Sequence, residues 1–206
     1  MRYPEIHRKK RIVGKRFLIS KMKYFKHAKA LVHSGAQIGE GTRVWAFTNI
    51  QPGAVIGKEC NICDGCFIEN GVLIGDYVTI KNHVSVFSGV HIEDNVFVGA
   101  NVAFINDRYP RSHRENEWVL EKTIIKKGAT LGSNSTILCG ISIGEYAVIG
   151  AGSVITKSVP AHIIMHGNPA KENGYACYCG RRLNEDLKCA CGKKYISNDQ
   201  GLEIDE

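Results

Sequence analysis

The chain has 206 residues, an apolar fraction of 44% and a formal net charge of +7. No apolar run approaches the roughly 20 residues of a membrane-spanning helix, and no cleavable leader opens the chain. We therefore expect a cytoplasmic protein without a membrane span. Residues 1–21 hold eight Lys or Arg and a single acidic residue, whereas the remaining chain has 19 of each sign. The folded part is neutral overall, which argues against a nucleic-acid-binding body.

Residues 1–22 form a basic N-terminal extension. Its composition predicts a solvated, poorly ordered segment, or one that touches an anionic surface electrostatically. Residues 23–31 are interpreted as a lead-in, with a turn of helix that covers the first coil of the domain that follows.

An apolar residue falls at every sixth position from Val32 to Phe104, without a slip. The fourth residue after each of them, except after Phe104, is small or β-branched. A period of six is neither the 3.6 of a helix nor the 2 of a simple strand, so it predicts a short-period repeat of the kind that builds β-helices. The positions of this column are Val32, Ile38, Val44, Ile50, Ile56, Ile62, Ile68, Ile74, Ile80, Val86, Ile92, Val98 and Phe104.

Three such hexads are expected to make one triangular coil. The column residue and the residue four later point inward, Gly, Asn and Asp form the corners, and coils stack about 4.8 Å apart. Cys60 and Cys66 occupy positions that other hexads fill with Ala, Thr or Val. We therefore interpret them as buried core residues rather than metal ligands, whereas Cys63 and Cys139 lie at turn-side positions.

The register breaks once. Residues 105–118 have no column and are rich in polar groups, and a long loop inside a regular solenoid is usually functional. The column is expected to resume at Val119 and to end before Pro160, where an irregular segment closes the last coil. The positions of this second column are Val119, Ile125, Leu131, Ile137, Ile143, Ile149 and Ile155.

Residues 173–206 form a C-terminal tail that contains an internal duplication. Cys177 and Cys179, then Cys189 and Cys191, are each separated by one residue and followed by Gly and two cations. Two such knuckles facing each other predict one structural Zn²⁺, although zinc knuckles normally place two to four residues between their cysteines. The alternative is a reduced, flexible tail with free thiols.

The hexads, the loop and the segments 119–132, 141–154 and 167–170 resemble the hexapeptide-repeat acyltransferases. Within them the chain is most similar to enzymes that acetylate the 3-amino group of a UDP- or dTDP-linked amino sugar. The resemblance implies an all-β domain at residues 23–172, folded as a left-handed parallel β-helix. It also implies a homotrimer whose active sites lie between neighbouring prisms and take acetyl-CoA and the nucleotide sugar.

The resemblance and the residue chemistry together suggest site residues. Asn82 matches a polar side chain that contacts the reacting amine, and His83 beside it is a candidate base. Glu69 and Asn70 are assigned to the sugar. Loop residues suited to the pyrophosphate and the base, where Arg matches phosphate geometry, are Asn106, Arg108, Tyr109 and Arg111. The expected contacts of acetyl-CoA are Gly150, Gly152, Lys157, Pro169 and Lys171.

Two other functions stay open. An O-acetyltransferase acting on a small alcohol would need a histidine base such as His83 or His113. A non-catalytic or carbonic-anhydrase-like β-helix would need three histidines around a metal. His33, His83 and His91 are not spaced to stack on one face, which argues against the second.

Overall fold

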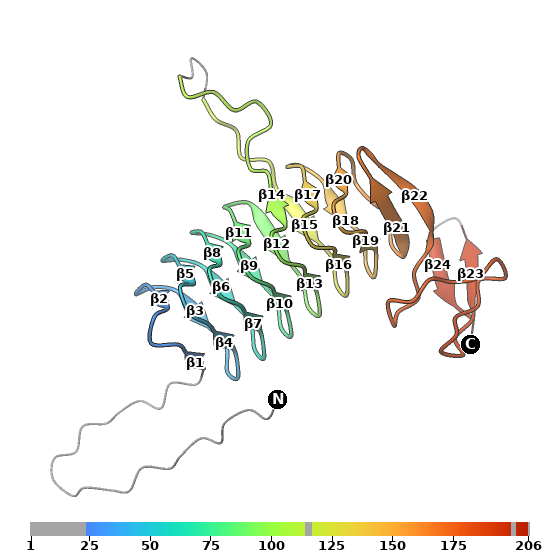
Figure 1. The fold of residues 1–206 in the computed structure, drawn as a ribbon, viewed down its shortest axis with the longest axis horizontal. Helices are drawn as coiled ribbons and strands as arrows, with labels where there is room; N and C mark the ends of the chain where they lie inside the picture. The colour runs from blue at the N-terminus through green and yellow to red at the C-terminus, as the bar shows by residue number, and fades with distance from the viewer. Residues whose placement is uncertain (1–23, 114–116, 199–200, 206) are drawn as a thin grey trace, which may run out of the picture.

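The computed structural model describes residues 24–113, 117–198 and 201–205. The basic extension of residues 1–22 lies outside the described residues. Every regular element of the described chain is a β-strand (Figure 1). No helix long and apolar enough to cross a membrane occurs in the described part of the chain.

Three sheets form the faces of a triangular solenoid (Figure 1). The nine-stranded sheet contains β1 (Phe25–Lys26), β4 (Arg43–Val44), β7 (Asn61–Ile62), β10 (Thr79–Ile80), β13 (Phe97–Val98), β16 (Thr130–Leu131), β19 (Val148–Ile149), β21 (Ile163–Gly167) and β22 (Ala170–Tyr175). The seven-stranded sheet contains β2 (Leu31–Val32), β5 (Asn49–Ile50), β8 (Phe67–Ile68), β11 (Ser85–Val86), β14 (Ala103–Phe104), β17 (Thr136–Ile137) and β20 (Val154–Ile155). The six-stranded sheet contains β3 (Gln37–Ile38), β6 (Val55–Ile56), β9 (Leu73–Ile74), β12 (Val90–Ile92), β15 (Thr123–Ile125) and β18 (Ser142–Ile143).

Apart from β22, the strands of each face pair in parallel with the strand one coil later. Phe25 pairs with Arg43, three hexads further along the chain, which confirms the prediction of three hexads per coil. Phe97 instead pairs with Thr130, almost twice as far along the chain, because the loop leaves the solenoid within that coil. The strands on either side of the loop therefore stack as if it were absent.

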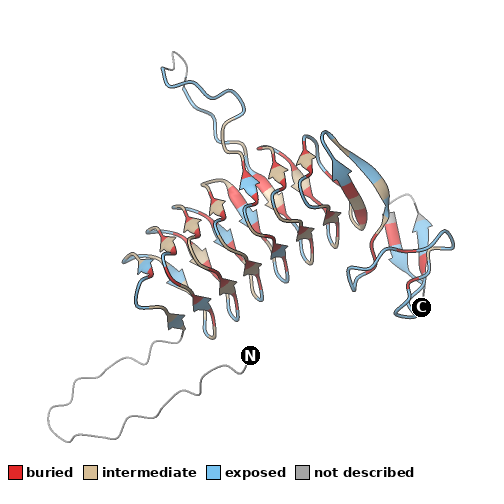
Figure 2. Ribbon diagram, in the orientation of Figure 1, coloured by how far each residue is buried: buried red, intermediate tan, exposed pale blue. Residues whose placement is uncertain are grey.

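The predicted column fills the core (Figure 2). Ile50, Ile80 and Ile137 are fully buried, as is the small residue at Ala54. The small-residue positions four residues after the column also hold hydroxyl groups, and that of Thr48 donates to the carbonyl of Cys63, in the next coil, at 2.8 Å. Cys60 and Cys66 are buried in the core as predicted, and burial raises the pKa of the Cys66 thiol to about 11.

Three boundaries differ from the sequence-based expectations. Val119 does not belong to a column: it is 74% exposed, and the solenoid resumes only at β15, so the loop extends to residue 122. The lead-in contains the short strand β1 rather than a turn of helix. The closing segment is not irregular, because β21 adds in parallel to β19 and then pairs with β22 as an antiparallel hairpin.

The C-terminal tail folds as a small unit beyond β22. It contains β23 (Tyr195–Asn198) and β24 (Gly201–Ile204), which form a two-stranded antiparallel sheet. Figure 1 shows this unit at the end of the solenoid opposite the first coil. It encloses a separate small core.

Candidate functional site

The corners that come directly after strands β7, β10, β13, β16 and β19 of the nine-stranded sheet lie along one edge of the prism. We call this the first edge and define it as residues 63–66, 81–84, 99–102, 132–135 and 150–153. Backbone bonds connect its corners: Asn101 donates to the carbonyl of Asn82 at 3.0 Å, and Gly152 donates to the carbonyl of Ser133 at 2.9 Å. The candidate catalytic residues Asn82 and His83 therefore share one edge with Gly152, three coils away. Stacked coils at about 4.8 Å put roughly 14 Å between them.

Asn82 is held by the preceding coil of this edge. Its side-chain nitrogen lies 3.4 Å from Oδ2 of Asp64, a residue that sequence reasoning missed. His83 takes the left-handed backbone conformation that the corner requires, with φ of 59°, and its backbone N–H donates to the carbonyl of Asp64. Since the His83 side chain is exposed and Asn82 half-buried, both are available to a ligand.

A hollow of about 350 Å³ lies beside Asn82 on the outer face of the nine-stranded sheet. Trp45 forms part of its floor and is fixed by a 2.8 Å bond from its indole nitrogen to Asn61. The hollow thus combines an aromatic surface with groups of both charges. Its lining residues are Arg43, Trp45, Asn61, Cys63, Asp64, Lys81 and Asn82.

Glu69 and Asn70 follow β8 and lie on a different edge, the one that also carries the loop. A Glu69 carboxylate oxygen accepts the backbone N–H of Ser88 at 2.7 Å, and the Ser88 hydroxyl donates to the carbonyl of Asn70 at 2.7 Å. A second hollow of about 450 Å³ includes Asn70 and, from the base of the loop, Leu120 and Lys122. Glu69 is therefore committed to a corner bond, whereas Asn70 faces the hollow.

Arg108 anchors the base of the loop. Its guanidinium makes a two-pronged bond to the Glu121 carboxylate, at 2.9 and 2.8 Å, and also donates to the carbonyl of Cys139 at 2.7 Å. These bonds lower the pKa of Glu121 and raise that of Arg108. Burial, followed by the charge of Glu121, raises the pKa of the Cys139 thiol. The predicted phosphate ligand thus holds the loop to the prism.

The outer part of the loop presents exposed side chains. Tyr109 is 77% exposed, and the Arg111 guanidinium donates to the neighbouring carbonyl of Pro110 at 2.8 Å. The backbone carbonyl of Asn106 accepts the Trp118 indole N–H at 3.2 Å, which ties the two arms of the loop together. Tyr109 and Arg111 lie beyond this tie along the chain, and Figure 1 shows the loop standing well clear of the solenoid.

Four of the five predicted coenzyme residues gather near the end of the first edge. A Cβ at Gly152 would meet nothing within 4 Å, so this corner is open, whereas one at Gly150 would press on His166. The backbone N–H of Gly167 donates to the Ser153 hydroxyl at 3.2 Å. This bond holds the turn between β21 and β22, which contains Pro169 and is followed by Lys171, beside the Gly152 corner. Lys157 is the exception, because it follows β20 and lies on the loop edge.

The structure therefore divides the predicted site between two edges of one chain. Asn82 and His83 share an edge with Gly152, while Glu69, Asn70 and the loop lie on another. The histidines of the carbonic-anhydrase-like alternative are equally dispersed, since His33 follows β2, His83 follows β10 and His91 lies within β12.

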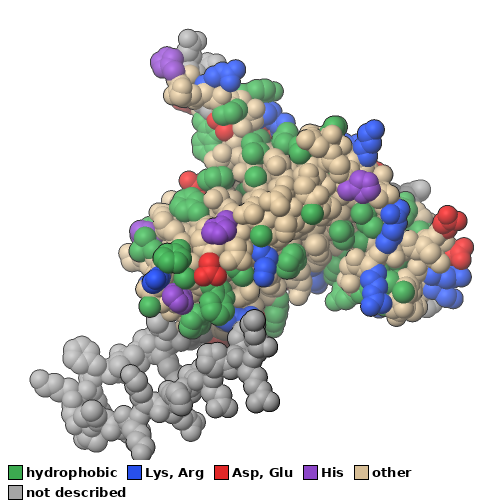
Figure 3. Space-filling view, viewed as in Figure 1, with side chains coloured by type: hydrophobic (Ala, Val, Ile, Leu, Met, Phe, Trp, Pro, Cys, Tyr) green, Lys and Arg blue, Asp and Glu red, His purple; other side chains and the backbone are tan. Residues whose placement is uncertain are grey.

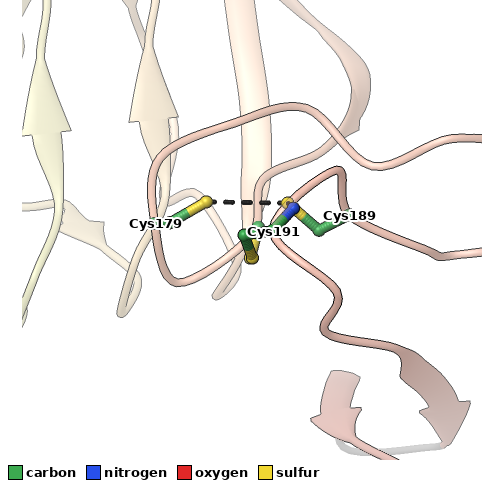
Figure 4. Close-up of side chains that lie close together, drawn as sticks. Cys179, Cys189 and Cys191 are labelled. Carbon is green, nitrogen blue, oxygen red and sulfur yellow. Dashed lines mark hydrogen bonds between the residues drawn. The ribbon is translucent and has the colours of Figure 1, made fainter.

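The four tail cysteines come together. Their sulfur atoms all lie within 4.8 Å of one another, and the Cys177–Cys191 and Cys179–Cys189 sulfur pairs are each 3.5 Å apart. Figure 4 shows Cys179, Cys189 and Cys191 grouped between two loops of the tail. Cys177 and Cys189 are buried, and Cys179 and Cys191 face solvent.

Known proteins match both the repeat and the whole domain. The family described as bacterial transferase hexapeptide (six repeats) matches residues 35–70 and 122–157, and the hexapeptide repeat of succinyl-transferase matches residues 89–105. The dTDP-3-amino-3,6-dideoxy-alpha-D-galactopyranose 3-N-acetyltransferase of Aneurinibacillus thermoaerophilus is 50% identical over 174 residues, which cover 83% of this chain and 90% of that protein.

Further matches are more distant. The bifunctional protein GlmU of Nitratidesulfovibrio vulgaris is 30% identical over 143 residues, which cover 68% of this chain and 28% of that protein. Among solved structures, a mutant of AntD, an N-acyltransferase from Bacillus cereus in complex with dTDP and coenzyme A, is 19% identical. The match covers 75% of this chain and 78% of that chain, with a TM-score of 0.43.

Proposed function

The chain belongs to the family of hexapeptide-repeat sugar N-acetyltransferases, and from that premise we propose that it moves the acetyl group of acetyl-CoA to the 3-amino group of a dTDP-linked 3-amino-3,6-dideoxyhexose. The observation that carries this proposal is the 50% identity to a 3-N-acetyltransferase over 90% of that protein's length. The resemblance of the sequence left UDP- and dTDP-linked sugars open, and the relative's substrate favours dTDP. We propose the cytoplasm as the compartment of this reaction.

The chemistry is the attack of an uncharged amine on a thioester. A bond forms between the sugar nitrogen and the acetyl carbon, the bond from that carbon to sulfur breaks, the amine loses a proton, and CoA leaves as the thiol after taking up a proton. The enzyme's main contribution is to hold the two reactants in line. The first edge suits this task because it carries Asn82 and the open Gly152 corner on one continuous backbone ladder.

Asn82 is assigned to the reacting amine. Its side-chain nitrogen lies 3.4 Å from the Asp64 carboxylate, so we assign its oxygen to accept an amine N–H and to aim the nitrogen lone pair at the thioester. His83 is assigned to proton removal from its exposed position on the same corner. Near Gly152, the cationic side chain of Lys171 is assigned to a CoA phosphate, and Pro169 to packing on the adenine.

We propose a homotrimer, in which two neighbouring chains together form a complete site. In one chain, Asn82 and the residues assigned to the nucleotide sugar lie on different edges, so a cleft between two copies would bring one edge of each together. The loop also exposes apolar side chains that a second copy would cover: Trp118 is 42% exposed, Val119 74% and Leu120 42%. Size-exclusion chromatography with light scattering tests this assembly, and a monomer that is fully active would contradict it.

The activity is tested with purified chain, acetyl-CoA and dTDP-3-amino-3,6-dideoxygalactose. We expect stoichiometric release of the CoA thiol and a gain of one acetyl group in the mass of the sugar nucleotide. The matched comparisons are the UDP-linked sugar, the 4-amino isomer and the 3-hydroxy analogue. Turnover of the 4-amino isomer alone would overturn the position of transfer, and turnover of the hydroxy analogue alone would show an O-acetyltransferase.

A further inference from the structure

We propose that the C-terminal unit is a zinc module in which Cys177, Cys179, Cys189 and Cys191 bind one Zn²⁺ as a tetrathiolate. The module caps the last coils of the solenoid. The sequence suggested a metal site, but each cysteine pair is separated by only one residue, which is shorter than in ordinary zinc knuckles. The structure removes this objection, because the two short knuckles face each other.

The two knuckles repeat the same backbone geometry. In the first, Gly180 donates to the carbonyl of Cys177, and in the second Gly192 donates to the carbonyl of Cys189. Both glycines adopt positive φ, 81° and 92°, which an L side chain rarely adopts. Because each turn closes directly after its second cysteine, one intervening residue is enough to direct both sulfurs to the same side.

The distances between the sulfurs fit a metal better than a pair of disulfides. Zn–S bonds of about 2.3 Å in a tetrahedron require sulfurs about 3.8 Å apart. The Cys177–Cys191 and Cys179–Cys189 sulfur pairs are each 3.5 Å apart and all four sulfurs lie within 4.8 Å of one another, whereas a disulfide requires about 2.05 Å. Two further groups donate to the cluster, because the Tyr195 hydroxyl lies 3.2 Å from the Cys177 sulfur and the Cys191 backbone N–H lies 3.5 Å from that of Cys189.

The module has too little apolar core to hold its fold without such a cross-link. The buried residues of its core cluster are Cys177, Leu183, Cys189, Tyr195 and Leu202, two of which are themselves proposed ligands, and Tyr175 and Leu187 pack against this cluster. Units of this size usually depend on a metal or on disulfides. A zinc ion bound by both knuckles would connect residues 177–179 to residues 189–191 at the centre of this core.

The charges around the cysteines also fit the proposed complex. Zn²⁺ with four thiolates carries a formal charge of −2, and each knuckle is followed, after its glycine, by two cationic residues, Arg181 and Arg182 in the first and Lys193 and Lys194 in the second. Figure 3 shows several Lys and Arg side chains, together with Asp or Glu side chains, at this end of the molecule. The cationic residues of the module are Arg181, Arg182, Lys188, Lys193 and Lys194.

Aromatic rings connect the module to the solenoid. The Tyr146 ring, on a corner of the prism, lies 4.9 Å from that of Tyr178 and stacks on His162 at 5.2 Å. The His162 ring in turn meets the edge of Tyr195 at 5.5 Å, and the His162 carbonyl accepts the backbone N–H of Ala176 at 2.7 Å. Since Tyr178 and Tyr195 belong to the module, a metal that orders the knuckles also fixes the cap on the last coils.

The first experiment measures the metal content of the full chain. The chain is purified under reducing conditions, without a chelator and without nickel-affinity chromatography. Elemental analysis should find about one zinc per chain. Cys177→Ser and Cys191→Ser should each lose most of it, whereas Cys66→Ala, a buried cysteine of the solenoid, should retain it. Zinc below about a tenth of an equivalent in the parent chain, or equal zinc in all four proteins, would overturn the proposal.

The second experiment replaces the metal and does not depend on the folding of variants. The chain is stripped with a chelator at low pH, refolded with Co²⁺ and examined by absorption spectroscopy. Thiolate-to-cobalt charge-transfer bands with intense visible bands of tetrahedral Co²⁺ are expected, together with protection of residues 176–198 from protease when Zn²⁺ is restored. Octahedral cobalt spectra, disulfides in the reduced preparation, or native iron in place of zinc would contradict the proposal.

Discussion

The side-chain nitrogen of Asn82 lies 3.4 Å from Oδ2 of Asp64, one coil earlier on the first edge of the prism. Asn61 and Cys63, which precede Asp64, line the same hollow as Asn82. The contact fixes which end of the Asn82 amide faces outward. In the role proposed for Asn82, the oxygen, and not the nitrogen, would face the substrate amine and accept its N–H.

Substitution of this pair should affect turnover more than substrate affinity. We expect Asn82→Ala to lower kcat by about 100-fold with little change in KM, because the amine loses its aim. Asp64→Ala should lower kcat by about fivefold, the equivalent of one hydrogen bond of about 1 kcal/mol. Asp76→Asn, an acidic residue at another edge, is the matched control and should leave kcat unchanged. A rise in KM alone for Asn82→Ala would contradict the assignment.

The histidine beside Asn82 separates N-acetylation from O-acetylation. An amino sugar is nucleophilic without prior deprotonation by a strong base, so His83→Ala should reduce kcat by less than about tenfold, as should His113→Ala. An alcohol acceptor would need the imidazole, and either variant would then cost about 100-fold or more. Initial rates of CoA thiol release with each variant decide between these outcomes.

The six-residue repeat indicates which residues of the candidate site lie side by side, which local sequence motifs do not. Asp64 could have been found from the sequence, because it stands one coil, or three hexads, before Asn82. The alignment of His83 with Gly152, and so of Asn82 with the residue before Gly152, follows from the same rule once the loop is removed from the count. The Arg108–Glu121 bond is different, because both residues lie where the register is broken and no periodicity relates them.

Arg108 and Glu121 can be distinguished as loop anchor and phosphate ligand. If Arg108 acts by holding the loop, Arg108→Ala and Glu121→Ala should raise the KM for the sugar nucleotide by similar factors, about three- to tenfold, since each removes the same salt bridge. Arg111→Ala is the comparison, because that side chain donates to Pro110, within the loop itself. A far larger effect of Arg108→Ala than of Glu121→Ala would show direct phosphate binding.

The anchor should also depend on pH. The bond from Arg108 holds the pKa of Glu121 below the ordinary 4.5, so the bridge is complete above that value and is lost as the pH falls through the lowered pKa. Trp118 reports on the loop, and in the Trp45→Phe chain it is the remaining tryptophan. Its fluorescence should change at a pH below 4.5, and the transition should disappear in the Trp45→Phe, Glu121→Gln chain. An unchanged transition in that double variant would contradict the assignment.

The same periodicity that predicts the core also misplaces one residue. Val119 is apolar and stands six positions before Ile125, yet it is exposed on the loop. Spacing alone does not show whether a segment can pair with the coils on either side. The strand that does pair begins at Thr123, opposite Val90. The end of the loop is therefore set by the pairing of Thr123 with Val90 in the preceding coil. A six-residue pattern in the sequence does not contain this pairing.

Ser135 and Ser153 occupy the same core position in two adjacent coils, and removal of their hydroxyl groups should change stability in opposite directions. The buried Oγ of Ser135 has no hydrogen-bond partner among the described residues, whereas that of Ser153 accepts the backbone N–H of Gly167. Ala30 occupies the equivalent corner position in the first coil, so alanine fits this column. We expect Ser135→Ala to raise the free energy of unfolding by up to about 1 kcal/mol, and Ser153→Ala to lower it by about 1 kcal/mol. Urea denaturation at one fixed chain concentration measures both changes. Destabilisation by Ser135→Ala would show that its hydroxyl has a partner, and that polar groups in this core are satisfied throughout.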